Sequence, residues 1–308
     1  MQRVYKFSLD KSSKKFHCPS CGKKRFVRYV DQETGKYVAH EFGRCDREVN
    51  CGYFKMPYGN EVTEFKYIPQ EIIPPTFHDF NLVENSVYKT NENNFFKHLA
   101  FIFGLKISWE IIQKYKIGTA NYFYNGTIFW QIDELDKVRG GKIIQYQTNG
   151  HRTKKTNWVH SHLLKMKHIN EFHLSQCLFG LHLIQDNKNS PIAIVESEKT
   201  ACIMSMIFPK FLWMACGSLH GLTLDKLRPI KDRKVILYPD SSNPKNGKSA
   251  HQIWSDYADT FNNLGYEIYV SDLLENFTNN EQKMRGFDLA DFIHSASFKN
   301  RIHELRRN

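Results

Sequence analysis

The sequence predicts an α/β protein whose C-terminal part is a parallel sheet flanked by helices, preceded by an α+β subdomain and a small N-terminal β module. Three observations support this prediction. From residue 191 onward, short apolar strand-like runs alternate with helical patterns, as expected for a parallel sheet covered by helices. Between about 90 and 165, two helical patterns precede β-rich runs. The first 57 residues are strand-like and rich in glycine, cysteine and basic residues.

Changes in composition and sequence pattern divide the chain into four segments. Hydrophobic residues make up 41% of the 308 positions and aromatic residues 14%, which is typical of a chain that folds. We expect an N-terminal module over 1–60 and an extended linker over 61–80, because the latter holds three prolines and no steady period. The α+β subdomain is expected over 81–188 and the parallel-sheet domain over 189–308.

Four cysteines of the N-terminal module occur as two pairs, each followed at once by glycine. They are Cys18, Cys21, Cys45 and Cys51. Four thiolates from two turns suit the tetrahedral shell of structural Zn²⁺, and zinc can fold a module too small to bury much core. The second pair is spaced more widely than a standard zinc knuckle, so His17 or His40 remains an alternative ligand.

Other features of the sequence bear on where the protein is located in the cell and on which cysteines lie in its core. No segment reaches the roughly 18 apolar residues of a membrane helix, and the N-terminus lacks the apolar stretch of a signal peptide. We therefore expect a cytoplasmic protein without a membrane partner, in which disulfides are rare. Cys177, Cys202 and Cys216 lie in apolar runs and are expected in the core.

The chain is basic, with 43 Lys and Arg against 32 Asp and Glu, and a net charge of +11. Residues 1–60 hold thirteen of the basic residues and six of the acidic ones. Such an excess favours a polyanionic partner, and cations mixed with aromatic rings suit single-stranded nucleic acid. The candidate contacts are Lys24, Arg25 and Arg28. Alternatively, these charges only solvate the module while the aromatic residues form its small core.

The α+β segment contains two helical patterns and a hairpin. The stretches NNFFKHLAFIFGL and SWEIIQKYKIG are apolar at helical spacing, and we expect a glycine to close each helix. The runs GTIFWQID and GKIIQYQTNG, separated by ELDKVRG, predict an antiparallel pair of strands.

Acidic residues follow two strands of the predicted parallel sheet. Glu196 follows IAIV and Asp240 follows KVILYP, so both are expected at the edge where ligands gather in such sheets. Two carboxylates at that edge can bind a divalent cation. The stretch FDLADFI adds Asp288 and Asp291, which can share a helical face, and Lys199 should lie in the same crevice. The alternative is that these acids only cap helices.

These motifs carry a family resemblance. The region from 191 to about 295 resembles the Toprim domain, which primases, some topoisomerases and some nucleases use to hold magnesium, in IVESEKTA, WMACGSLHG, ILYPDSS and FDLADF. The resemblance implies that Glu196 and Asp240 hold Mg²⁺ or Mn²⁺, with Asp288 and Asp291 as additional acids. Ser242 stands where the second acid of the Toprim Asp-x-Asp is expected. A hydroxyl brings no charge, which weakens the expectation of two-metal chemistry.

The resemblance continues upstream. FGLKISWEIIQKYKIG, TIFWQIDELDKVRGGKIIQYQ, KKTNWVHS and CLFGLHLI are similar to successive segments of bacterial replicative (DnaG-type) primases, and the N-terminal cysteine module fits the same order. The chain is also similar to zinc-ribbon Toprim proteins of mobile elements. The resemblance implies a basic patch that cradles template or triphosphate. Its residues are Arg139, Lys142, Lys154 and Lys155.

The resemblance therefore implies a primase-like nucleotidyltransferase that uses single-stranded DNA and nucleoside triphosphates in replication of a mobile element or phage. Glu196, Asp240 and Lys199 are the expected catalytic residues. Because no helicase motif is present, any helicase would be a separate partner. Two alternatives remain open. One is a Toprim nuclease, in which water replaces the attacking hydroxyl, and the other is an inactive adaptor that binds single strands.

Overall fold

The computed structural model of the chain comprises two compact units, Met1–Ile72 and Ile73–Asn308. The division between them falls within the segment predicted as a linker. Among the described residues, no helix is both long and apolar enough to cross a membrane. The described residues are 2–47, 50–57, 62–66, 73–89, 92–244 and 247–294.

The N-terminal unit is built from short antiparallel strands. They are β1 (Gln2–Tyr5), β2 (Phe7–Leu9), β3 (Phe16–His17), β4 (Lys24–Asp31), β5 (Gly43–Cys45), β6 (Phe54–Lys55) and β7 (Val62–Lys66). One sheet has the order β2-β4-β5-β6 with β3 also paired to β4, and β1 pairs with β7. Strand β7 lies inside the stretch expected to be an extended linker. It becomes a strand because Lys66 pairs with Gln2, a long-range partner that no local pattern indicates.

The core of the N-terminal unit is small. Its buried cluster consists of Cys18, Phe26 and Cys45, with Phe16 and Tyr53 packed against it. Two of the three buried side chains are therefore cysteines of the predicted metal site. Such a core buries little apolar surface, so the cysteines themselves must contribute to stability.

The second unit contains the two predicted helices, α2 (Asn94–Phe103) and α3 (Leu105–Tyr115), and the predicted hairpin, together with helices α1 (Phe80–Val87) and α4 (Val159–Lys165), which the sequence patterns do not predict. Its sheet has the order β11-β10-β9-β8. The strands are β8 (Gly118–Ala120), β9 (Gly126–Ile132), β10 (Val138–Tyr146) and β11 (Arg152–Trp158). The expected antiparallel pair is β9–β10.

The ends of the first two predicted helices differ in one respect. Gly104 closes α2 with a positive φ of 81°, as predicted. Helix α3 instead ends at Lys116, which adopts the left-handed conformation with φ 52°, and the expected glycine, Gly118, opens β8. Gly118 is needed there for packing, because a Cβ at this position would lie 2.1 Å from the hydroxyl of Ser86.

The predicted parallel sheet is present. Its strands are β12 (Ile192–Val195), β13 (Leu212–Ala215), β14 (Lys234–Tyr238) and β15 (Glu267–Val270). They pair in parallel in the order β13-β12-β14-β15. The connecting and flanking helices are α5 (Glu198–Ile207), α6 (Leu224–Leu227), α7 (Ala250–Asn262), α8 (Leu273–Phe277), α9 (Asn280–Arg285) and α10 (Leu289–His294), with 3₁₀ turns η2 (Leu181–Ile184) and η3 (Arg228–Ile230).

The strand order places a topological switch point at β12. From β12 the chain crosses to β13 on one side, and the next strand, β14, lies on the other side. In open sheets of this kind, ligands bind in the crevice beyond the carboxyl ends of the strands at such a point. Glu196 and Asp240 follow the two strands that flank this crevice.

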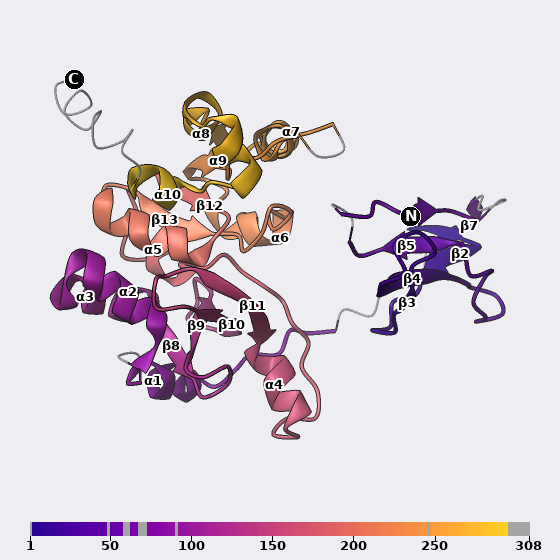
Figure 1. The fold of residues 1–308 in the computed structure, drawn as a ribbon, viewed down its shortest axis with the longest axis horizontal. Helices are drawn as coiled ribbons and strands as arrows, with labels where there is room; N and C mark the ends of the chain where they lie inside the picture. Colours follow the sequence, from indigo (N-terminus) through magenta and orange to yellow (C-terminus); the bar gives the residue numbers. More distant parts are fainter. Residues whose placement is uncertain are drawn as a thin grey trace. The chain divides into compact units, whose positions relative to one another are not determined.

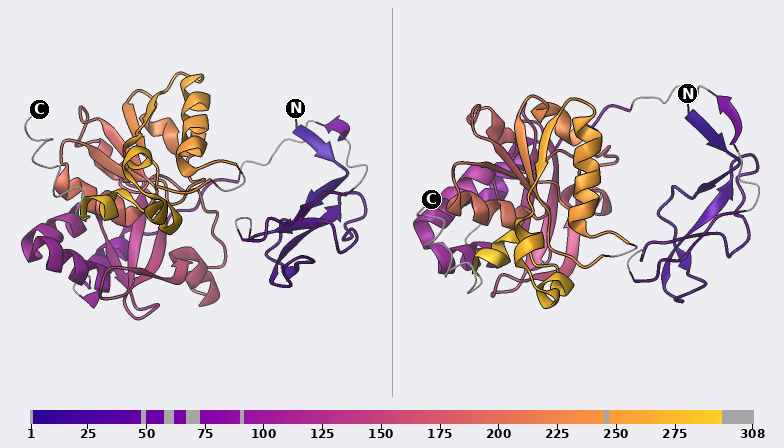
Figure 2. Two further views of the ribbon diagram at one scale, coloured as in Figure 1. Left: turned by 45° about the horizontal axis from the view of Figure 1, so that its top comes forward. Right: turned by 90° about the horizontal axis from the view of Figure 1, so that it is seen from above.

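The antiparallel and parallel sheets share one core within the second unit (Figure 1). The Tyr115 hydroxyl donates a hydrogen bond to the Trp213 carbonyl at 2.9 Å, and the Tyr115 and Phe179 rings stack at 5.1 Å. Figure 2 shows the antiparallel and the parallel sheet of this unit side by side from two further directions. Cys177, Cys202 and Cys216 are buried, as predicted.

Candidate functional site

The four N-terminal cysteines form a compact cluster. All four sulfur atoms lie within 4.8 Å of one another. The Sγ atoms of Cys18 and Cys51 are 3.7 Å apart, and those of Cys21 and Cys45 are 4.0 Å apart. A tetrahedron with Zn–S bonds of about 2.3 Å has edges of about 3.8 Å, so this donor set fits structural zinc.

The glycine that follows each cysteine pair has the same left-handed conformation. Gly22 and Gly52, which follow Cys21 and Cys51, both have φ 65°. In the first turn, the Gly22 N–H donates to the Cys18 carbonyl, and in the second, the Cys51 N–H donates to the Arg47 carbonyl. The second pair brings its sulfur atoms to the cluster although its spacing is wider.

The histidines considered as alternative ligands lie outside the cluster. The His17 ring contacts the Gly22 carbonyl at 3.0 Å, and His40 lies against the Phe26 ring. The cysteines themselves differ in acidity. A hydrogen bond from the Lys23 backbone lowers the pKa of Cys21 to about 6, whereas burial raises the pKa of Cys45 to about 12.

The predicted DNA-binding residues of the N-terminal unit fall into two kinds. Lys24 and Arg25 are exposed on β4. Arg28 instead donates to the Val38 carbonyl, and its guanidinium lies 5.1 Å from the Phe16 and Tyr37 ring centroids. Arg28 is thus engaged within the unit, while Lys24 and Arg25 are available to a partner.

Glu196 and Asp240 lie next to each other beyond the carboxyl ends of β12 and β14. The Asp240 backbone N–H acts on the Glu196 carboxyl and partly lowers its pKa. Burial raises the pKa of Glu196 to about 7, with a further contribution from the charge of Asp288. Burial, followed by the charges of Glu196 and Asp288, raises the pKa of Asp240 well above its ordinary value.

Asp288 and Asp291 stand at the start of α10 and interact with the same acids. The Asp291 N–H donates to the Asp288 carboxylate at 2.8 Å. Helix α5 supplies two further contacts to Asp288, because the Thr200 hydroxyl donates to it at 2.8 Å and the Lys199 Nζ lies 3.8 Å from it. Burial and the charge of Asp288 raise the pKa of Asp291.

Glu196, Asp240, Asp288, Asp291 and Lys199 act on one another's charges in the structure, and we call this group the acid cluster. Its carboxylate oxygens are the donors that Mg²⁺ and Mn²⁺ prefer, and its buried, mutually repelling charges would be relieved by a cation. Within the described residues, no three of these carboxylates lie within 4.8 Å of one another, as the cysteine sulfurs do. Mg²⁺ needs only one or two carboxylates because it keeps several waters.

Ser242, which stands in place of the second acid of Asp-x-Asp, has a structural partner. Its hydroxyl accepts a hydrogen bond at 2.8 Å from the backbone N–H of Ala250, the first residue of α7. The first N–H groups of a helix have no partner within the helix, so Ser242 satisfies one of them. No local sequence pattern indicates this contact.

The predicted cations of the hairpin differ in their surroundings. Lys142 on β10 is 9% exposed, and its Nζ donates to Glu198 at 2.9 and 3.2 Å and to the Gly217 carbonyl at 2.9 Å. The ion pair joins the antiparallel sheet to the first turn of α5. Arg139 is also occupied, because it donates to Asp133 at 2.6 Å.

Lys154 and Lys155 lie on β11 and are exposed. The Nζ of Lys155 is 5.6 Å from the centroid of the Tyr124 ring, which is 86% exposed. These side chains form an open basic and aromatic surface, in contrast to the enclosed Lys142.

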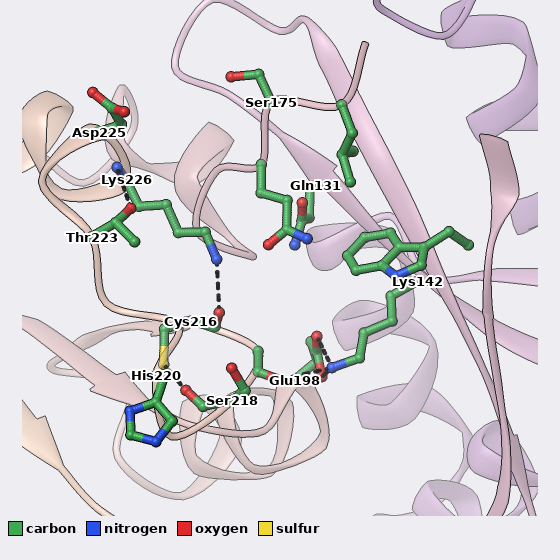
Figure 3. A pocket seen from close by; sticks show the side chains of 15 residues that line it. Gln131, Lys142, Ser175, Glu198, Cys216, Ser218, His220, Thr223, Asp225 and Lys226 are labelled. Atoms are coloured by element: carbon green, nitrogen blue, oxygen red, sulfur yellow. Dashed lines mark hydrogen bonds and ion pairs between the residues drawn. The ribbon is translucent and has the colours of Figure 1, made fainter. Parts of the chain in front are cut away.

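A pocket of about 590 Å³ lies beside the Lys142–Glu198 pair (Figure 3). Its walls come from the antiparallel sheet and from the segment after β13, and they include Gln131, Trp158 and Lys226. The Lys226 Nζ donates to the Cys216 carbonyl at 3.0 Å, and burial lowers its pKa. Sequence patterns did not indicate Gln131, Glu198 or Lys226, because their roles depend on partners distant in the chain.

Two protein families match parts of the chain. Residues 5–65 match a family described as a zinc beta-ribbon finger, in agreement with the cysteine cluster. Residues 93–241 match a family described as a domain of unknown function (DUF6371). A search of curated proteins gives no match to this chain.

Among solved structures, DnaG-type and phage primases are similar to this chain. The primase fragment of the bacteriophage T7 primase-helicase protein is 14% identical over 94% of this chain and 97% of its own, with a TM-score of 0.44. The Aquifex aeolicus primase (zinc binding and RNA polymerase domains) is 13% identical over 97% and 79%, with a TM-score of 0.41. The RNA polymerase domain of Mycobacterium tuberculosis primase DnaG is 10% identical over 71% and 78%, with a TM-score of 0.47. Similarity this distant assigns no activity to the chain.

Proposed function

We propose that this protein is a Toprim-type, metal-dependent, primase-like nucleotidyltransferase that acts on single-stranded DNA. The observation that carries the proposal is the acid cluster at the switch point of the parallel sheet. Glu196, Asp240 and Asp291 all have raised pKa values because they are buried near like charges. Lys199 is the cation paired with the cluster through Asp288. A divalent cation would compensate the remaining charge.

The four acids would hold the cation from two different places in the fold. Glu196 and Asp240 would hold the cation from the strand ends, and Asp288 and Asp291 from the start of α10. When bound, Mg²⁺ or Mn²⁺ would supply the positive charge that stabilises the phosphoryl oxygens while a 3′-hydroxyl attacks the α-phosphate of a nucleoside triphosphate. Lys199 would contact a phosphate from the same crevice.

Template contact would fall on the exposed cations rather than on the enclosed ones. Lys154 and Lys155 on β11, and Lys24 and Arg25 on the N-terminal unit, face solvent. Arg139 and Arg28 would have to exchange their present hydrogen bonds to bind DNA, and Lys142 would have to leave Glu198. A cytoplasmic location, a separate helicase and service to a mobile element stay predictions.

The proposal is tested by incubating the purified chain with single-stranded template, labelled nucleotides and Mg²⁺ or Mn²⁺. We expect extension products that disappear in Glu196→Gln and Asp240→Asn, because each change removes a metal-binding charge. The matched control is Glu267→Gln, an exposed residue of β15. Shortening of the template without extension would assign the site to a nuclease instead.

An inactive adaptor is the second candidate, and the contact of Ser242 favours it. Its hydroxyl is used by α7, and it brings no charge to the acid cluster. An adaptor would give neither extension nor cleavage, and Glu196→Gln would bind single-stranded DNA as tightly as the native chain. Calorimetric titration with Mn²⁺ separates the two further, because an adaptor does not require uptake of the ion.

A further inference from the structure

The turn between α2 and α3 displays apolar side chains that the second unit does not bury. Phe101 is 89% exposed, Leu105 70%, Ile107 44% and Trp109 39%. Single exposed apolar residues are normal on a soluble protein, whereas several at one place mark a surface that binds another molecule. Figure 1 shows α2 and α3 at the outer edge of this unit, so the turn is open to a partner.

Helix α3 has a buried face and an exposed face. The buried residues are Ser108, Ile111, Ile112 and Tyr115. On the exposed face, Leu105 and Trp109 are one turn apart and form an apolar stripe beside α2, because the Trp109 ring lies 6.0 Å from the Phe96 ring. Lys106 and Glu110 are also one turn apart and form a charged stripe, which lies about 100° further around the helix.

The two charges of this stripe do not neutralise each other. Within the described residues, neither Lys106 nor Glu110 forms a salt bridge. In α9, by contrast, Arg285 donates to Glu281 at 2.6 Å across the same spacing. The acid precedes the base in α9 but follows it in α3, and the second order gives the weaker pair within a helix. Both charges of α3 are therefore available to an external partner.

Opposite charges one turn apart complement an antiparallel copy of the same helix. A twofold axis perpendicular to α3 would place Lys106 of each copy opposite Glu110 of the partner subunit, which pairs all four charges. The same axis would relate Leu105 to Trp109 of the partner subunit, because the midpoints of the two stripes differ by one residue, about 1.5 Å along the helix. Each stripe would then meet its own counterpart.

We propose that this surface binds the same surface of a second copy of the chain, with the two α3 helices antiparallel. We call it the α2–α3 surface; it consists of Phe101, Leu105, Lys106, Ile107, Trp109 and Glu110. The apolar stripes pack together beside the turn, where Phe101 in the last turn of α2 extends the contact. The charged stripes pair along the border. An acidic or a basic partner would match only one of the two charges, whereas a second copy matches both.

The dimer is independent of the proposed function. The α2–α3 surface shares no residue with the acid cluster or with the pocket beside Lys142. Sedimentation velocity of the purified chain, saturated with zinc, should show a reversible monomer–dimer equilibrium between about 1 and 100 µM, the range of moderate affinities. If the chain sediments as a monomer over this whole range, the inference is wrong.

The apolar contact is tested by a matched pair of leucine variants. Leu105→Gln should weaken the dimer by about tenfold or more, because it removes a large apolar side chain from the centre of the interface without adding charge. The control is Leu135→Gln in the turn between β9 and β10, where the leucine is 67% exposed. It should dimerise as the native chain does. Equal dimerisation of the two variants would overturn the inference.

The antiparallel arrangement is tested by exchanging the charges. Lys106→Glu and Glu110→Lys should each weaken the dimer by about tenfold, because like charges then face each other twice. The double variant Lys106→Glu, Glu110→Lys should dimerise as the native chain does, since the opposite pairs are restored. If the double variant is no better than the single ones, the two stripes do not face each other and the proposed arrangement is wrong.

A mixture of the two single variants gives an independent result. The first carries two acids in the charged stripe and the second two bases, so the mixture should form a mixed dimer more tightly than either variant alone forms its own. Absence of this preference would contradict the pairing across the axis. All these changes replace exposed side chains, so the melting temperatures should stay close to that of the native chain.

Discussion

The two units of this chain are stabilised by different means. In the N-terminal unit, three side chains form the buried cluster, and two of these are cysteines. The second unit has a continuous apolar core drawn from both sheets, including Trp130, Trp213 and Trp254. Metal ligation is therefore expected to hold the first unit and burial of apolar surface the second. Each unit should respond to changes that leave the other intact.

The largest expected effect is the loss of one zinc ligand. Cys45→Ser should release the metal and unfold residues 1–72, because zinc ligation contributes on the order of 10 kcal/mol to folding in small zinc modules. Zinc content and limited proteolysis measure this, with the fragment from residue 73 onward remaining protected. Cys177→Ala, which changes a buried cysteine of the second unit, should leave the zinc content unchanged. A full zinc content in Cys45→Ser would contradict the expectation that metal ligation by this cysteine stabilises the N-terminal unit.

A change in the second unit should destabilise that unit and leave the N-terminal unit intact. Lys142→Met leaves the buried carboxylate of Glu198 without its cation, which costs about 3–5 kcal/mol in comparable buried pairs. All five tryptophans lie between residues 109 and 254, so their fluorescence during denaturation reports on this unit. Zinc content should not change.

The double variant Lys142→Met, Glu198→Leu tests the reason for that loss. Removing both charges should restore most of the stability, because no unpaired charge then remains buried. Equal destabilisation in the single and double variants would show that packing, not charge, is responsible.

The next effect depends on pH and concerns the acid cluster. The pKa of Glu196 is raised to about 7, so the folded state holds this proton more tightly than the unfolded state. The free energy of unfolding of the metal-free protein should therefore fall as pH rises from about 4.5 to 7. Glu196→Gln should remove this loss, with a gain on the order of 2 kcal/mol at pH 8 and little gain at pH 4.5. Denaturant unfolding at both pH values measures it.

One result would argue against that account. A gain from Glu196→Gln of equal size at both pH values would mean that charge is not the cause. The exposed control Glu267→Gln should leave the difference between the two pH values unchanged. With Mn²⁺ present, the native chain should recover stability at pH 8, because the ion compensates the charge.

The smallest effect is expected at Ser242. Ser242→Ala removes the acceptor for the Ala250 N–H and should cost about 1 kcal/mol. Ser242→Asp should keep the stability, because a carboxylate also accepts at a helix start, and it should strengthen Mn²⁺ binding in calorimetry. Weaker binding in Ser242→Asp would mean that this side chain does not face the ion.

Much of the fold could be predicted because its signals are local. The alternation of strands and helices after residue 191 and the β9–β10 hairpin depend on periodicity within a few residues, and the structure confirms both. Strand β7 is not predictable from local pattern, since its partner is β1 at the other end of the unit. The sequence pattern predicts that α3 closes at Gly118, whereas the helix ends at Lys116. The packing of Gly118 against Ser86, which explains this glycine, is not visible in the sequence.

The sequence by itself determined the cysteine pairs and the acids at the strand ends, since spacing and strand polarity fix where such residues lie. The structure alone decided what each charge contacts. Lys142 pairs with Glu198, which lies 56 residues away, and Ser242 serves α7 rather than the acid cluster. Gln131 and Lys226 line one pocket only because elements distant in the chain pack together. The physical reason is that hydrogen bonds and ion pairs form between neighbours in space, and a linear pattern specifies those neighbours only over short separations.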